Sequence, residues 1–163
     1  MVEIRKQENL RISEIEKIEI EIDQLPLDAS GIVEPKTLHE GRFSIYFIAA
    51  LALAEGKVTV DNLTEEKVLD PNLTALRKKV HAQGGLLNAG LSSKVRIIMK
   101  DGETYERYTP APKGSTEKPL TNEELKDKFK TTSGLPPDRA EAVIHQVMEM
   151  ENLSSVKDIL TLL

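Results

Sequence analysis

Three histidines are the residues of this sequence best suited to move a proton near neutral pH, because imidazole titrates between about pH 5 and 8. His39 precedes the most apolar segment of the chain and is the candidate acid or base, although no partner for it is evident and a surface role is the simpler interpretation. His81 is expected at the end of a helix, where a cation favours the helix dipole. His145 lies beside an apolar helical stripe, so both of these are interpreted as structural or surface residues.

The apolar segment RFSIYFIAALALAEGKV, residues 42–58, contains further groups that could contact a substrate. The guanidinium of Arg42 could hold a carboxylate through two parallel hydrogen bonds, or it could cap the preceding loop or stay solvated. Tyr46 offers a phenol, whereas Ser44 lacks the G-x-S-x-G context of an activated nucleophile. The segment as a whole is interpreted as core rather than as a cofactor pocket.

Composition excludes several classes of site. The chain has 163 residues, no cysteine, and 22 Lys and Arg against 27 Asp and Glu, a net charge of −5. Thiolate metal sites are excluded, no metal-binding or phosphate-loop motif occurs, and we expect no metal and no cofactor. An acidic chain with six aromatic residues is not expected to bind nucleic acid. The longest apolar run, 12 residues from Phe43 to Ala54, is shorter than the roughly 20 that span a membrane, so a cytoplasmic protein without a membrane partner is predicted.

Two strand patterns stand out. Ile18, Ile20 and Ile22 alternate with charged residues, which predicts a strand with one buried and one solvated face. The stretch KVRIIMKDGETYERYT predicts a hairpin whose two-residue turn is Asp101-Gly102. Both patterns come before Pro110, where the character of the chain changes.

Helical signals surround and follow these strands. Gly56 suits the left-handed position that ends a helix, and Thr121 with Glu124 forms a capping box. The stretch 25–41 is predicted to be a long loop, and QGGLLNAGLSS a flexible connector. Helices are expected over residues 2–9, 42–55, 61–69, from just past Pro71, from 121 through Phe129, from Pro136-Pro137 and over 154–162. The pattern is α+β: a small mixed sheet with helices packed on it over residues 1–110, and a helical tail over 111–163.

At EGRFSIYFIAALALAEGKV the sequence resembles the carboxy-terminal part of the MmgE/PrpD family, which includes 2-methylcitrate dehydratase, cis-aconitate decarboxylase and iminodisuccinate epimerase. Glu40, Phe43, Ser44 and residues 49–56 fit a family pattern close to E-A-x-F-S-L-P-Y followed by an alanine- and leucine-rich helix ending in D/E-G. ISEIEKIEIEI, DPNLTALRKKV, VRIIMKDGETYERY and PKGSTEKPLTNEELKDKF resemble further family segments in the same order, so the resemblance covers about residues 12–163.

The resemblance implies a lid-like α+β domain followed by helices that return to a separate, all-helical domain. It also implies that the main acid and base residues lie upstream, in a part that this chain lacks. One departure concerns Tyr46, which stands one position earlier than the family tyrosine. One helical position is a rotation of about 100°, so Tyr46 is a doubtful counterpart.

Two functions follow from the resemblance. In the first, the chain is part of a lyase or isomerase of small di- or tricarboxylates, completed by a separate helical subunit or by a part of the same protein that this sequence does not include. His39 and Tyr46 are then its catalytic candidates, and Arg42, Ser44 and Lys113 its substrate-binding candidates. In the second, the chain is a non-catalytic binding or oligomerisation module. The apolar stripes of the tail predict a partner in both cases, either a homo-oligomer or a helical subunit.

Overall fold

The structure is a computed structural model that describes residues 1–8, 10–85 and 91–162. It divides into two compact units, Met1–Pro112 and Lys113–Leu163. Residues 86–90 of the glycine-rich stretch predicted as a connector, QGGLLNAGLSS, lie outside the described residues.

The first unit is built on a four-stranded mixed sheet in the order β2-β1-β3-β4. Strand β1 (Ile15–Ile22) pairs in parallel with β2 (Val80–Gly84) and antiparallel with β3 (Ser93–Met99), which pairs antiparallel with β4 (Thr104–Thr109). The alternation predicted for β1 is confirmed, because its isoleucines are buried and its charged residues are not. The expected α+β class with a mixed sheet is likewise confirmed.

The predicted hairpin joins β3 to β4, but its loop is longer than two residues. The amide of Met99 donates to the carbonyl of Glu103 at 2.8 Å, which leaves Lys100, Asp101 and Gly102 as a three-residue loop. Gly102 has φ 88°, as expected for the left-handed residue that ends such a loop. The Asp-Gly pair therefore marks the turn correctly but not its length.

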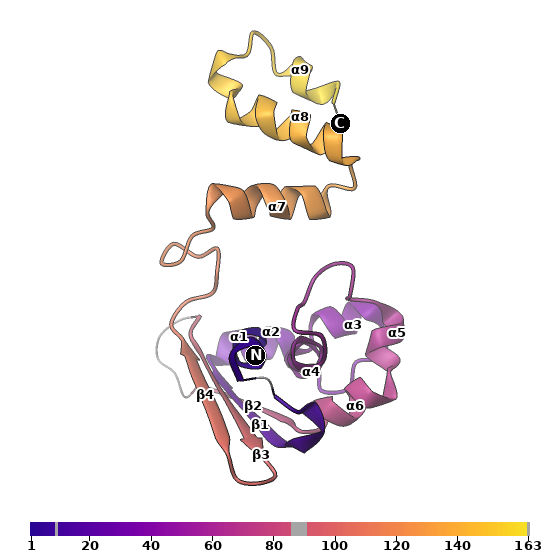
Figure 1. Ribbon diagram of the computed structural model, residues 1–163, viewed down its shortest axis with the longest axis vertical. Helices are drawn as coiled ribbons and strands as arrows, with labels where there is room; N and C mark the ends of the chain where they lie inside the picture. Colours follow the sequence, from indigo (N-terminus) through magenta and orange to yellow (C-terminus); the bar gives the residue numbers. More distant parts are fainter. Residues whose placement is uncertain (9, 86–90, 163) are drawn as a thin grey trace. The chain divides into compact units, whose positions relative to one another are not determined.

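Helices of the first unit lie along one side of the sheet (Figure 1). The central one is α4 (Ile45–Glu55), in which Phe47 and residues 49–53 are buried, so the interpretation of this segment as core is confirmed. Gly56 ends α4 at φ 71°, as predicted. The other helices are α1 (Val2–Glu8), α2 (Gln24–Ser30), α3 (Leu38–Arg42), α5 (Glu65–Leu69) and α6 (Pro71–Arg77), with a 3-10 turn at Ile12–Glu14.

Three expectations about these elements are wrong. The stretch 25–41 is not one loop, because it contains most of α2 and α3; Pro26 fits the first turn of α2, where a missing N–H loses no helical hydrogen bond. The helix expected from Arg42 begins at Ile45, since Ser44 takes the capping position. His81 is not at a helix end but in β2, a strand of five residues that was not predicted.

The sheet face opposite to the helices carries charged side chains that pair across strands. Arg96 of β3 contacts Glu19 of β1 at 3.3 Å and Glu106 of β4 at 2.8 Å. The guanidinium of Arg96 lowers the pKa of Glu106 as the largest single cause. The pKa of Glu19 is also lowered, mainly by Lys17 and to a smaller extent by Arg96. This face is therefore solvated, as the sequence pattern predicts.

The second unit contains α7 (Asn122–Thr132), α8 (Pro137–Met148) and α9 (Lys157–Leu160), with a 3-10 turn at Met150–Asn152. The predicted capping box is present, since the Thr121 hydroxyl accepts from the Glu124 amide and the Glu124 carboxylate accepts from the Thr121 amide. No helix in the described part of the chain has the length and apolarity that crossing a bilayer requires.

Candidate functional site

The junction between α3 and α4 carries two of the predicted site residues, His39 and Arg42. Thr37 caps α3 by accepting a hydrogen bond from the Glu40 amide at 3.2 Å. His39 and Arg42 are both exposed on this short helix. The His39 ring lies 5.2 Å from the Phe43 ring, centroid to centroid. The junction thus presents an imidazole and a guanidinium to solvent, close together in the chain.

Ser44 lies next to them in sequence but is fully buried. Its hydroxyl accepts a hydrogen bond from the Phe47 amide at 3.1 Å and so caps α4. The cap uses the acceptor capacity of the hydroxyl inside the core, which gives Ser44 a structural task. A contact between Ser44 and a substrate remains a prediction.

Tyr46 lines a cleft at the first turn of α4. The cleft has a volume of about 350 Å³ and is bounded by the end of α6, the start of β2 and the stretch before α3. Its lining residues are Val33, Glu34, Tyr46, Arg77, Lys78, Val80, His81 and Ala82. Tyr46 and His81 are both among the lining residues, although His81 pairs with Glu19 and so faces the charged side of the sheet. His39 and Arg42 do not line this cleft.

Arg77 is the residue of this cleft that the sequence reasoning missed. It is the last residue of α6 and only 7% exposed. In sequence it opens the run Arg77-Lys78-Lys79, which resembles a solvated helix end. The spacing of Arg77 in the sequence could have indicated its burial. Arg77 stands four residues after the apolar Leu73, and residues four apart share one face of a helix.

Lys113, the remaining substrate-binding candidate, belongs to the second unit and forms an ion pair with Glu124. This hydrogen-bonded contact is the largest cause of the lowered pKa of the Glu124 carboxyl. Lys113 therefore supports the start of α7, and a contact with substrate remains a prediction for it as well.

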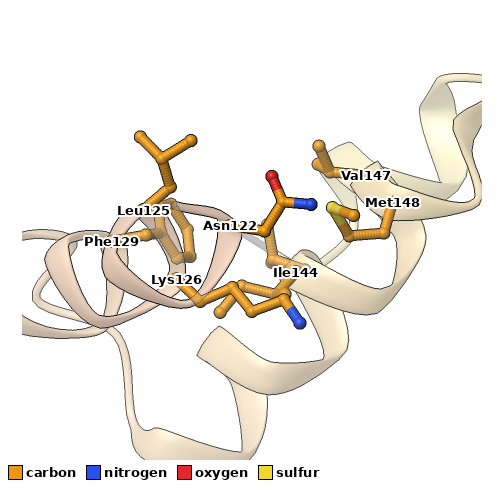
Figure 2. Close-up of a pocket in the computed structure, with 8 residues that line it drawn as sticks. Asn122, Leu125, Lys126, Phe129, Ile144, Val147 and Met148 are labelled. Atoms are coloured by element: carbon orange, nitrogen blue, oxygen red, sulfur yellow. The ribbon is translucent and has the colours of Figure 1, made fainter. Parts of the chain in front are cut away.

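An apolar groove lies between α7 and α8 in the second unit (Figure 2). Leu125 and Phe129 extend from α7, and Val147 and Met148 extend from α8. Leu125, Val147 and Met148 are each about half exposed. The groove has a volume of about 230 Å³, and six of its eight lining residues are apolar, so it is suited to apolar side chains rather than to a carboxylate.

Metal chemistry has no visible support in the described residues. Within residues 1–8, 10–85 and 91–162, no group of three or more His, Asp or Glu side chains is arranged to hold a metal ion. The helix junction carries the guanidinium of Arg42, and the lining residues of the cleft include Tyr46, Arg77 and His81.

Comparison with known proteins identifies the family. Residues 1–150 match the sequence model of the MmgE/PrpD C-terminal domain. Cis-aconitate decarboxylase of Mus musculus is 30% identical over 125 residues, which are 73% of this chain and 26% of that protein. Cis-aconitate decarboxylase of Homo sapiens is 29% identical over 135 residues, 79% of this chain and 28% of that protein. The chain thus spans about a quarter of the length of these relatives, and it belongs to the MmgE/PrpD family as its C-terminal domain.

Proposed function

We propose that this chain is the C-terminal part of a lyase or isomerase that acts on a small di- or tricarboxylate. The match of residues 1–150 to the MmgE/PrpD C-terminal domain carries the proposal. The relatives named as cis-aconitate decarboxylases make a tricarboxylate such as cis-aconitate the first substrate to test. The reaction is a dehydration, a decarboxylation or an epimerisation, and it takes place in the cytoplasm.

The chain is incomplete by itself in this proposal. Removal of a proton next to a carboxylate requires a positioned base and cations that hold the developing charge. The described residues supply exposed cations, but the ring contact of His39 is with Phe43 rather than with a carboxylate that would orient it. A helical domain outside these residues, on the same or on another polypeptide, supplies the base, and the first unit of this chain serves as a lid over the substrate.

Arg42 is the substrate contact of the lid. Its side chain is exposed, and among the described residues it forms no ion pair. It follows an exposed imidazole by three positions on α3. A guanidinium held in this way can bind a substrate carboxylate through two hydrogen bonds.

The test is an Arg42→Ala variant in the enzyme assembled from this chain and the polypeptide that completes it. A charge-assisted hydrogen bond contributes about 1.5–3 kcal/mol, so we expect KM for the carboxylate to rise at least about tenfold. Arg11→Ala is the matched control, because Arg11 is exposed but precedes the 3-10 turn before β1. Unchanged KM in the Arg42 variant would remove Arg42 from the site.

A second function, a non-catalytic binding or oligomerisation module, is favoured by the groove between α7 and α8. Leu125 and Val147 leave apolar surface exposed there, and such surface in soluble proteins marks an interaction site. The molar mass of the purified chain in solution, alone and with the completing polypeptide, tests this. Two results together would favour the non-catalytic module: self-association of this chain, and equal enzymatic activity of the completing polypeptide with and without it.

A further inference from the structure

The carboxylate of Glu40 is bound to the backbone at the start of α3. Its Oε2 accepts a hydrogen bond from the amide of Lys36 at 2.6 Å, while the amide of Glu40 donates to the hydroxyl of Thr37 at 3.2 Å. These two contacts tie the side chain and the backbone of Glu40 to the turn before the helix. Among the described residues Glu40 forms no ion pair, so backbone binding is the task that the structure gives this carboxylate.

The helix that Glu40 joins to this turn is too short to fix its own position. α3 has five residues, and a helix of little more than one turn has little stability of its own because helix nucleation is unfavourable. Its orientation is therefore set by capping and packing contacts. The buried Gly41 fixes the side on which α3 packs, since a Cβ there would lie 2.7 Å from Cγ2 of Val68. With Gly41 turned to the core, His39 and Arg42 remain exposed.

The direction of the Arg42 side chain depends on this arrangement. Arg42 is the last residue of α3 and stands two positions after Glu40. Residues two apart on a helix do not face each other, and the Glu40 carboxylate is bound to the Lys36 amide instead. Among the described residues Arg42 forms no ion pair. The guanidinium therefore keeps its donors for an anion from outside these residues.

We propose that Glu40 is a positioning residue, whose hydrogen bond to the Lys36 amide fixes the first turn of α3 and so holds Arg42 in the direction in which it binds a substrate carboxylate. This role rests on the proposed function, in which Arg42 contacts the substrate. Glu40 itself does not touch the substrate, because like charges repel. Without the hydrogen bond the turn opens more often, and the apparent affinity falls with the fraction of molecules in which Arg42 is correctly directed.

The first measurement is amide hydrogen exchange of the full chain by NMR, which requires no turnover. The Gly41 amide donates to the Thr37 carbonyl at 2.9 Å, so its exchange reports local opening of this turn. We expect Glu40→Ala to accelerate that exchange about three- to tenfold, the effect of one lost hydrogen bond. Glu40→Gln should keep most of the protection, because its amide oxygen also accepts. Asp70→Ala is the matched control, since it removes a carboxylate that caps α6 and should leave exchange at Gly41 unchanged.

The second measurement is KM and kcat of the enzyme assembled from this chain and the helical domain that completes it. Glu40→Ala should raise KM for the carboxylate about three- to tenfold and leave kcat near that of the parent, and Glu40→Gln should restore KM. In an Arg42→Ala background, Glu40→Ala should raise KM no further, because a residue that acts through Arg42 has no effect once that side chain is removed. Asp70→Ala should lower Tm without changing KM, which separates positioning from a general loss of stability.

Three results would each exclude the positioning role. They are equal exchange at Gly41 in Glu40→Ala and the parent, KM effects of Glu40→Ala and Arg42→Ala that multiply in the double variant, and a Glu40→Gln protein that behaves like Glu40→Ala. An assembled parent enzyme that turns over no small carboxylate would instead refute the proposed function. In that case the exchange measurement alone would still decide whether Glu40 fixes the first turn of α3.

Discussion

Replacing Ser44 by alanine tests whether this buried hydroxyl is a structural cap. Ser44 is fully buried and accepts from the Phe47 amide at 3.1 Å. Loss of a serine N-cap destabilises proteins by about 0.5–2 kcal/mol. Leaving a buried amide without an acceptor destabilises by about 1–3 kcal/mol. Because water cannot replace the hydroxyl at this position, we expect Ser44→Ala to lower the free energy of unfolding by about 2 kcal/mol.

The assay is urea unfolding of the full chain, monitored through the amide signals of α4 so that the first unit is followed by itself. The midpoint should fall while the slope with urea stays constant, because only stability changes. In a domain of about 100 residues, each kcal/mol of lost unfolding free energy lowers Tm by about 4 °C. The Tm of Ser44→Ala should therefore fall by roughly 8 °C.

Thr64→Ala is the matched control for this prediction. The Thr64 hydroxyl caps α5 by accepting from the Lys67 amide at 3.3 Å, but α5 has five residues and Thr64 is only partly buried. Solvent can replace this cap, so the effect should be less than half of that at Ser44. If the free energy of unfolding of Ser44→Ala lay within about 0.5 kcal/mol of that of the parent, the range of ordinary surface substitutions, the Ser44 hydroxyl would not be a structural cap.

Two further predictions concern charge and backbone. The pKa of Glu106 is lowered from its ordinary value of 4.5, chiefly by Arg96; its contribution to stability is therefore present above that value and lost as pH falls through the lower folded-state pKa. Tm should therefore fall as the pH is lowered into the acidic range, and this fall should be smaller in Arg96→Gln. Equal dependence of Tm on pH in the two proteins would show that Arg96 is not the cause of the lowered pKa. Gly56→Ala should lower the free energy of unfolding by at least about 1 kcal/mol because φ is 71° and the new Cβ would lie 3.3 Å from Nε of Arg5. Gly134→Ala is the control, because Gly134 has φ 72° and open space around it. It should lower the free energy of unfolding of the second unit through the backbone effect alone. Equal losses of unfolding free energy at the two glycines would show that the Arg5 contact contributes nothing.

The features predicted correctly from sequence are those that depend on neighbouring residues. The alternation of Ile18, Ile20 and Ile22 identifies β1 because a strand exposes every second side chain to the same face. The capping box at Thr121 and the left-handed Gly56 are likewise local signals, and both are present in the structure. The family resemblance, which depends on several such segments in register, is confirmed over residues 1–150.

The features that were missed depend on distant contacts. Strand β2 has five residues and becomes a strand only by pairing with β1, where Val80 lies opposite Ile18. That pairing also brings His81 to the cleft that Tyr46 lines. The burial of Arg77 follows from how α6 packs, and composition around Arg77 favours a solvated helix end. Which cations share a site was therefore not predictable from spacing in the chain.

Proton exchange at the carbon next to a carboxylate, followed in heavy water for a panel of small tricarboxylic acids, tests most directly whether this chain is part of a lyase or isomerase. Dehydration, decarboxylation and epimerisation all change bonding at or next to this carbon. We expect no exchange with the purified chain alone, and exchange once the helical domain of the same family completes it. Exchange catalysed by these 163 residues alone, or none from a stable complex with the completing polypeptide, would contradict it.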